Sequence, residues 1–528
     1  MQANSGPAWA PAHENDPNQL QSVVPIRGNR TPDTDVTAIE KPAGLLSMAA
    51  LAVLAIALLR MLSVAPFDGP LISDNQHYFF IAERAASGVP PHVSQFDPKT
   101  SFTMLATAAA IRSGRELGVN DLHSARALSV AATAGVVTLA FLCARSLGGN
   151  AAGLVAALAM LGFSGFMGMG AMGVRPKVFM ALFTLGALLA ASRRRPLACG
   201  AASALAFLCW QSTALVAVFA LIDLLVAPRR LRSFALYCAG FALALLPYEL
   251  YFVAHDALAQ QWEQTIVYPS MYMTHGLGLK LLGRHVVWFL RVQEGFNSAS
   301  VLPALSVAAA AVAWLWCLAR PSRVGGWLSA RPGWIALVAG GHAALLFTLH
   351  DYQGFPDRFL VEPFMAVGIG LLLGLPVSAL ARHSRYPAAA LLLAVSVAVL
   401  LPLALPGRNL SAGRKLASQY RLAERVHAMQ ESGQSIYAVG CTHLLAFSHM
   451  DNHVPLGLGI RGMTAWMHDR GDLPWKPLRD GRLPDVVLHS RSPMPGGNRW
   501  LKKNYRQVAD KQFASHKVKV YMLIDQSM

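Results

Sequence analysis

The residues best suited to chemistry gather in one polar stretch, DNQHYFFIAERAASGVPP at 74–91, which follows the first long apolar run at 45–65. Its first acid is Asp74, and an ionised carboxylate can take a proton from a hydroxyl group during a transfer reaction. Apolar and polar side chains are mixed after it, which is typical of a helix that lies in the membrane interface. The sequence therefore predicts a carboxylate at the depth of a lipid headgroup.

Basic side chains that can hold a phosphate are expected at the same interface. Lys99 lies in the same loop as the carboxylate, Arg175 and Lys177 lie in the segment GVRPK, and a late loop carries Arg358. Arg can bind a phosphate through two parallel hydrogen bonds, whereas Lys acts as a point charge. Basic residues are disfavoured on the outer side of a membrane, which favours a role in anion binding for Arg175 and Lys177. These groups predict a site for a phosphate-bearing lipid and a hydroxyl acceptor.

Each of these residues also has a structural alternative. Asp74 can simply cap the helix that it precedes, because Asp is a preferred N-cap residue. His77 fits either interfacial packing or contact with a substrate. Lys99 can anchor a helix by snorkelling towards water. Arg358 can form an ion pair with its neighbour Asp357 that closes the bundle.

The composition is that of a polytopic membrane protein. Of 528 residues, 54% are hydrophobic and only 14% are charged. A formal net charge of +17 would suggest nucleic-acid binding in a soluble chain. Here the basic residues occur in short runs between apolar segments, which is the positive-inside pattern of membrane proteins. Nucleic acid is therefore not an expected partner.

The cysteine and histidine spacings indicate neither a disulfide framework nor a dedicated metal site. Five of the six cysteines lie inside apolar runs, and only Cys441 lies in a polar region. No CxxC spacing is present. The sequence thus predicts no resident metal, and it leaves open a divalent cation carried on the substrate phosphate.

Clusters of basic residues mark the cytoplasmic ends of the predicted spans, and counting between them gives about eleven spans within residues 45–405. Residues 197–226 lie between two such clusters, so we expect them to form a helical hairpin that turns at 210–213. Residues 66–121 are then wholly outside, and the helix expected at 101–117 cannot span. The clusters are Arg193–Arg195; Arg229, Arg230 and Arg232; Arg320 and Arg323; Arg382 and Arg385.

The expected fold class is an all-α membrane bundle with interfacial helices in its first outer loop and a small C-terminal α/β domain. Residues 1–44 are polar and form a disordered cytoplasmic tail. Residues 45–405 form the transmembrane domain, with the first outer loop at 66–121. Residues 406–528 form the α/β domain, with a helix at 410–432 and strands at 435–440, 485–489, 505–509 and 518–524.

The order of these features resembles that of the GT-C glycosyltransferases, in particular the branch that uses polyprenyl-phosphate sugars. That branch includes the protein O-mannosyltransferases and the aminoarabinose transferase acting on lipid A. Besides 74–91, the likeness rests on FDPKTSFTML at 96–105, on the arginine-containing run at 120–160 and on DRFLVEPF at 357–364. The order of apolar runs and charged motifs is alike over most of residues 45–405.

This resemblance implies roles for individual residues. Asp74 matches the acid that serves as catalytic base, Lys99 matches the lysine of the first loop, and Arg358 matches the arginine that contacts the lipid phosphate. One departure is the loop GVRPK, where many members carry a second acidic residue and this chain has Arg175 and Lys177. A second base or metal ligand at that place is therefore not implied.

The function that we expect is that of an integral membrane glycosyltransferase of the bacterial inner membrane. It would transfer a sugar from a polyprenyl-phosphate donor to a hydroxyl of an envelope glycan, glycolipid or protein on the outer face, with inversion and with Asp74 as base. The residues expected to bind substrate are His77, Lys99, Arg175, Lys177 and Arg358.

Two other functions stay open at this point. A transporter or flippase for a lipid-linked glycan would need charged residues deep in the spans. An O-antigen polymerase or ligase would carry its basic site in a long outer loop, and residues 255–300 are long enough for that.

The predicted topology can be tested at Ser113. A cysteine in its place should react with a membrane-impermeant thiol reagent in intact spheroplasts, because residues 66–121 are expected outside. The parent chain with its six native cysteines is the control. Labelling of the Ser113→Cys variant only after lysis would overturn the topology.

Overall fold

The computed structural model describes the chain with several gaps. The chain divides into two units, residues 1–47 and 48–528, and of the first unit only the start of helix α1 (Ala43–Leu62) is described. The predicted tail lies almost wholly outside the described residues, and so does the span that the span count expects at 301–319. These residues are 43–72, 74–226, 230–273, 283, 285, 332–350, 354–404, 416–460, 462–469, 483–490, 493–494 and 499–524.

Within the described residues, three helices are long and apolar enough to cross a membrane: α4 (Asp121–Gly148), α10 (Arg230–Ala254) and α17 (Glu362–Arg382). A fourth span is gained if α5 (Asn150–Gly162) and α6 (Ser164–Ala171), which meet at 65°, count as one. The predicted number of about eleven spans is therefore not confirmed.

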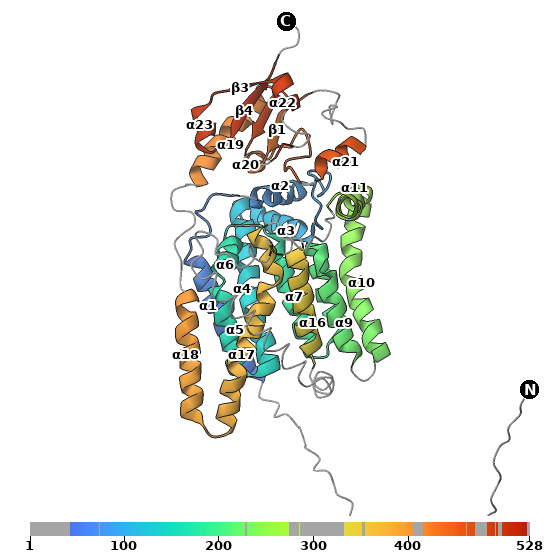
Figure 1. The fold of residues 1–528 in the computed structure, drawn as a ribbon. Helices are drawn as coiled ribbons and strands as arrows, with labels where there is room; N and C mark the ends of the chain where they lie inside the picture. Colours follow the sequence, from blue (N-terminus) through green and yellow to red (C-terminus); the bar gives the residue numbers. More distant parts are fainter. Residues whose placement is uncertain are drawn as a thin grey trace, which may run out of the picture. The chain divides into compact units, whose positions relative to one another are not determined.

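In several further apolar helices, the part whose side chains are described is only 10–17 residues long. They pack beside the long helices and complete the apolar bundle (Figure 1). Besides α1, they are α7 (Pro176–Ser192), α8 (Pro196–Cys209), α9 (Ala214–Leu225), α16 (Trp334–His350) and α18 (Tyr386–Ala404).

Small residues let neighbouring helices approach closely. A Cβ on Gly200 of α8 would lie 2.0 Å from the backbone oxygen of Tyr237, and one on Gly240 of α10 would lie 2.0 Å from that of Leu197. Gly374 of α17 is in the same way pressed against Ala152 of α5. Such small-residue contacts hold helices together where burial of apolar surface from water cannot.

The predicted hairpin at 197–226 is confirmed. Helices α8 and α9 are separated by Trp210 and a 3₁₀ turn, η1 (Gln211–Thr213), where the sequence placed the break. The Arg194 guanidinium donates to the backbone oxygen of Asp223, which brings the other ends of the two helices together.

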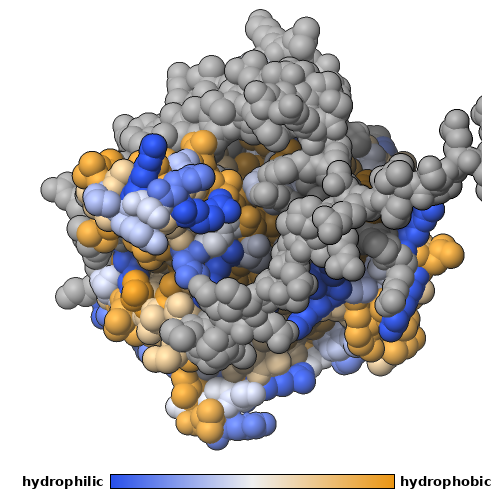
Figure 2. Space-filling model, turned by 90° about the horizontal axis from the view of Figure 1, so that it is seen from below, coloured by the Kyte–Doolittle hydropathy of each residue, from blue (hydrophilic) through white to orange (hydrophobic). Residues whose placement is uncertain are grey.

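Basic residues gather at the end of the bundle where Arg194 lies. Arg193–Arg195 follow α7, α10 begins at Arg230, and α17 ends at Arg382. Seen from below Figure 1, this face shows hydrophilic residues set between hydrophobic ones at its periphery (Figure 2). The basic clusters that were used to place the predicted spans thus lie together at one end of the bundle.

Two helices of residues 66–121, the segment predicted to be the first outer loop, lie across the ends of the long helices (Figure 1). They are α2 (Asn75–Ala86) and α3 (Phe102–Glu116). Helix α3 corresponds to the non-spanning helix predicted at 101–117, and it is not among the apolar helices. The interfacial position predicted for α2 needs correction. Every residue of α2 except Gln76 is buried, because the C-terminal region covers its second face.

The C-terminal region contains the long helix and the four strands that the sequence predicted, together with short helices that it did not predict. Helix α19 (Leu416–Glu431) is followed by β1 (Ile436–Val439), β2 (Val486–His489), β3 (Tyr505–Val508) and β4 (Lys519–Leu523). The sheet order is β1-β2-β4-β3, with β1 and β2 parallel and the other pairs antiparallel.

The remaining elements are short. They are α11 (Leu258–Trp262), the π-helical turn η2 (Glu263–Val267), α12 (Tyr268–Tyr272), the 3₁₀ helix η3 (Phe355–Leu360), α20 (His443–Phe447), α21 (Met463–Asp469), α22 (Arg499–Asn504) and α23 (Lys511–Ser515).

One side chain of the C-terminal region holds the start of the first outer loop. The Gln419 amide nitrogen donates to the backbone oxygen of Leu71 at 2.9 Å, and its oxygen accepts from the Leu71 backbone nitrogen at 2.9 Å. Further along the loop, the Phe96 backbone nitrogen donates to the oxygen of Pro455 at 2.8 Å. A single apolar core also joins α2, α3, α19 and the sheet.

We therefore predict that Gln419→Leu loosens the first outer loop. The change keeps the side-chain volume but leaves the Leu71 backbone nitrogen without its acceptor, which costs about 1–3 kcal/mol. The Leu71 oxygen keeps one donor, the Gln76 amide at 3.0 Å. Amide hydrogen exchange near residue 71 should become about tenfold faster or more. Gln430→Leu, at an exposed position of the same helix, is the control. Equal exchange in both variants would show that the amide does not hold the loop.

Candidate functional site

Asp74 pairs with a guanidinium rather than capping a helix. It immediately precedes α2, but its side chain makes no capping hydrogen bond. Arg175 instead donates from Nη1 to Oδ2 of Asp74 at 3.2 Å. The Asp74 side chain is 41% exposed, whereas that of Arg175 is 4% exposed. The carboxylate is thus held from behind by a buried cation and stays accessible from the other side.

Positive charge surrounds this carboxylate. Arg175 is the N-cap residue of α7, so the positive end of that helix dipole lies beside Lys177 as well. Burial raises the pKa of Asp74, but the charges of Arg175, Lys99 and Lys177 outweigh this, and the pKa is lowered overall. Asp74 is therefore ionised at neutral pH, within surroundings that favour a phosphate.

Lys99 points at a phenol. Its Nζ donates to the Tyr78 hydroxyl at 2.6 Å, and its backbone nitrogen donates to Oδ1 of Asp97 at 3.0 Å. Burial lowers the pKa of Lys99, but the pairing with Tyr78, Asp97 and Asp74 raises it more. The half-buried Lys99 is therefore charged and fixed in place, which a lysine that snorkels into water would not be.

Lys177 is neutralised by a carboxylate from the late loop. Its Nζ forms a short ion pair with Asp357 and lies 4.2 Å from the centre of the Trp210 ring. The side chains of the pair are only 11% and 9% exposed. Asp357 also accepts from the backbone nitrogen of Gly354 at 2.9 Å. The pair thus joins η3 to the start of α7.

Arg358 of η3 is buried and has an ionic partner at the start of α17. Its side chain is 1% exposed, and its Nε lies 3.3 Å from Oε1 of Glu362. The sequence allowed for a pair between Arg358 and Asp357, but each of them has another ionic partner. The structure brings five of the predicted residues together, because the charges of His77, Lys99, Arg175 and Lys177 all lower the pKa of Asp74. Arg358 is not among the groups that act on Asp74.

Arg126 is a positioning residue that the sequence analysis did not single out. It is 1% exposed, and it donates to the backbone oxygens of Phe67 at 3.0 Å, Gly69 at 2.5 Å and Met172 at 3.3 Å. It ties the segment before Asp74 to the segment before Arg175. A lone arginine at the start of an otherwise apolar span was the signal available in the sequence.

A second charged cluster lies on the other end of α2. Among the described residues, Glu83, Asp121 and His449 form a group whose ligand atoms lie within 4.8 Å of one another, close enough to hold a metal ion. Arg115 already pairs with Glu83 at 3.0 Å and with Asp121 at 2.7 Å. The hydrogen bond to Glu83 raises the pKa of His449. The cluster acts as an ionic contact between the loop and the C-terminal region.

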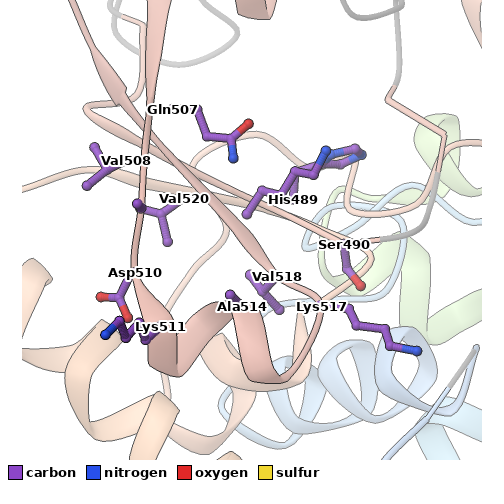
Figure 3. Close-up of a pocket in the computed structure, with 12 residues that line it drawn as sticks. His489, Ser490, Gln507, Val508, Asp510, Lys511, Ala514, Lys517, Val518 and Val520 are labelled. Carbon is purple, nitrogen blue, oxygen red and sulfur yellow. The ribbon is translucent and has the colours of Figure 1, made fainter.

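A pocket of about 620 Å³ lies in the C-terminal region, between the ends of β2, β3 and β4 and helix α23. Figure 3 shows Lys511 and Lys517 on opposite sides of it, with Ala514 and Val518 between them. Its lining comes from residues 489–490 and 507–520, so it includes none of the predicted site residues.

Comparison with known proteins gives one family and several similar structures. The family model for DolP-mannose mannosyltransferase matches residues 89–246. ArnT from Cupriavidus metallidurans, solved with undecaprenyl phosphate bound, is 15% identical with a TM-score of 0.56, and the match covers 92% of this chain and 99% of that one. A search of curated proteins gives no match.

An archaeal enzyme has a similar fold. The oligosaccharyltransferase from Archaeoglobus fulgidus in its apo form is 14% identical with a TM-score of 0.51, and the match covers 84% of this chain and 69% of that one. The expected resemblance is thus confirmed, and the family-model match favours an enzyme over a transporter. The chain therefore resembles a DolP-mannose mannosyltransferase over residues 89–246 and shares its fold with ArnT.

Proposed function

We propose that this protein transfers a sugar from a polyprenyl-phosphate donor to a hydroxyl of a cell-envelope glycan, glycolipid or protein. Similar structures contain such a lipid: ArnT was solved with undecaprenyl phosphate, and the Archaeoglobus fulgidus enzyme AglB with dolichol-phosphate. The observation that carries the proposal is the ionised, accessible carboxylate of Asp74 beside Arg175, Lys99 and the first turn of α7.

The proposed reaction is a single displacement. The acceptor oxygen attacks the anomeric carbon while Asp74 takes the proton of the acceptor hydroxyl. The bond between the anomeric carbon and the phosphate oxygen breaks, and the electron pair leaves with the lipid phosphate. Arg175 and Lys99 stabilise the charge that develops on that phosphate. The anomeric centre is inverted because the acceptor enters opposite the leaving group.

The remaining predicted residues have supporting parts in this proposal. Lys177 adds positive charge at the α7 terminus, although Asp357 balances much of it. Arg358 reaches the lipid phosphate only if its pair with Glu362 opens on binding. A divalent cation on the donor phosphate is compatible with the arrangement, and turnover with and without a chelator tests for it.

The membrane topology that goes with this proposal places the site on the outer face of the bacterial inner membrane. Residues 45–405 form the transmembrane domain with about eleven spans. Residues 406–528 form the outer α/β domain and residues 1–44 a cytoplasmic tail. The bonds between Gln419 and Leu71 support a common side for the first loop and the C-terminal region.

We predict that Asp74→Asn lowers turnover about 10²–10⁴-fold, because this is the usual cost of losing a general base. Stability should barely change, since the Asp74 side chain makes no capping bond. The measurement is transfer from a lipid-phosphate sugar by the purified full-length protein. Asp68→Asn, an exposed acid of the same loop, is the matched control. Near-normal turnover by Asp74→Asn would show that another group is the base.

We also predict that Arg175→Gln raises the KM for the lipid donor and changes the pH profile. Arg175 helps to keep the pKa of Asp74 below its usual value, so its loss should raise that pKa. The base form of Asp74 is then lost at a higher pH, and the acid limb of kcat/KM should move upward. A protein with an unchanged KM and an unchanged acid limb would contradict both roles of Arg175.

A further inference from the structure

Two buried side chains near Asp74 carry polar atoms that lack hydrogen-bond partners among the described residues. His77 is 3% exposed and Asp97 is 2% exposed. Neither ring nitrogen of His77 makes a hydrogen bond, and Oδ2 of Asp97 makes none either. Buried polar atoms are rarely left in this state, because they lose their bonds to water and gain nothing in return. A missing ligand is one physical reason for such atoms.

The spacing between the two groups fits one hydroxyl. Nε2 of His77 lies 3.7 Å from Oδ2 of Asp97, which is too long for a direct hydrogen bond. A hydroxyl oxygen at about 2.8 Å from both atoms could accept from the ring and donate to the carboxylate. Burial lowers the pKa of His77, more than Asp97 raises it, so the ring is neutral and carries one donor.

Both groups are held firmly in place. Oδ1 of Asp97 accepts from the Lys99 backbone nitrogen at 3.0 Å, which leaves Oδ2 directed at the histidine. The His77 ring packs edge-on against Tyr78, with their centres 5.7 Å apart. A preformed donor and acceptor on rigid supports can discriminate between ligands that do and do not offer a hydroxyl.

The position of the pair relates it to the proposed reaction. His77 lies three residues after Asp74, so both side chains lie on the same face of this helical segment. Asp97 lies two residues before Lys99, the proposed phosphate contact. In the proposed reaction the sugar ring must lie between the base and the phosphate. Asn75, next to Asp74, is also buried at 1% exposure. Both atoms of its amide lack a partner among the described residues, so it can offer a further donor and acceptor.

We infer that His77 and Asp97 form a subsite that binds one hydroxyl of the donor sugar and so helps to select the sugar. This inference rests on the proposed function. It assigns sugar recognition to a pair that is separate from the base and from the phosphate-binding cations.

The test compares dolichyl-phosphate mannose with its monodeoxy analogues as donors for the purified full-length protein. One analogue should lose at least tenfold in kcat/KM with the parent protein, because it lacks the bridging hydroxyl. With Asp97→Asn, an acceptor becomes a donor, and that analogue should differ from the full donor by less than threefold. His77→Phe keeps a flat ring but removes both nitrogens, and it should show the same loss of discrimination. Asp68→Asn and His255→Gln, at exposed positions, are the controls.

Two outcomes would overturn the inference in distinguishable ways. If both variants keep the full discrimination of the parent protein, the pair is structural while the proposed function stands. If the parent protein neither binds undecaprenyl phosphate nor uses any of the donors, the proposed function fails and the subsite fails with it. Failure of one variant to fold leaves the other to decide, since the two changes act on different elements.

Discussion

The arrangement of the site depends on the buried guanidinium of Arg126. It donates hydrogen bonds to three backbone oxygens, those of Phe67, Gly69 and Met172, which lie in two loops that are distant in the sequence. A buried charge is costly unless hydrogen bonds replace the water that it loses, and these carbonyls provide them. Because the two loops lead to Asp74 and Arg175, the same interaction sets the separation of the proposed base from its cation. A lysine, with a single charged head, could not reproduce this three-way geometry.

The charge balance around Asp74 suits two tasks that conflict in principle. A base must accept a proton, which a strongly positive environment discourages, whereas a departing phosphate needs that positive charge. In this structure Asp357 offsets much of the charge of Lys177, so only part of the positive charge acts on Asp74. Lys99 donates to the uncharged Tyr78 hydroxyl and keeps its charge. When the phosphate arrives, its negative charge offsets the remainder and raises the proton affinity of the carboxylate. Donor binding would then prepare the base for its task.

Local patterns in the sequence predicted several parts of this structure. The break at Trp210, the four strands of the C-terminal region and the helix at 101–117 were all marked by composition and spacing. The proximity of Asp74 to Arg175 followed from the expected sidedness of their loops. The burial of α2 did not, because its cover comes from residues more than three hundred positions away. The pairs of Asp357 with Lys177 and of Asp97 with His77 likewise depend on loop conformations that hydropathy does not encode.

The clamp between Gln419 and Leu71 closes a contact across 348 positions of the chain. A ribosome that has made the first outer loop must make almost the whole bundle before the partner of that loop exists. Until then α2 has an apolar face without its cover and polar groups without their partners. A nascent chain that stops before residue 419 would carry Asp74 and its surrounding cations without the contact that holds Leu71. Assembly of the candidate site is therefore one of the last steps in making this protein, because its supporting contact forms only after residue 419 is made.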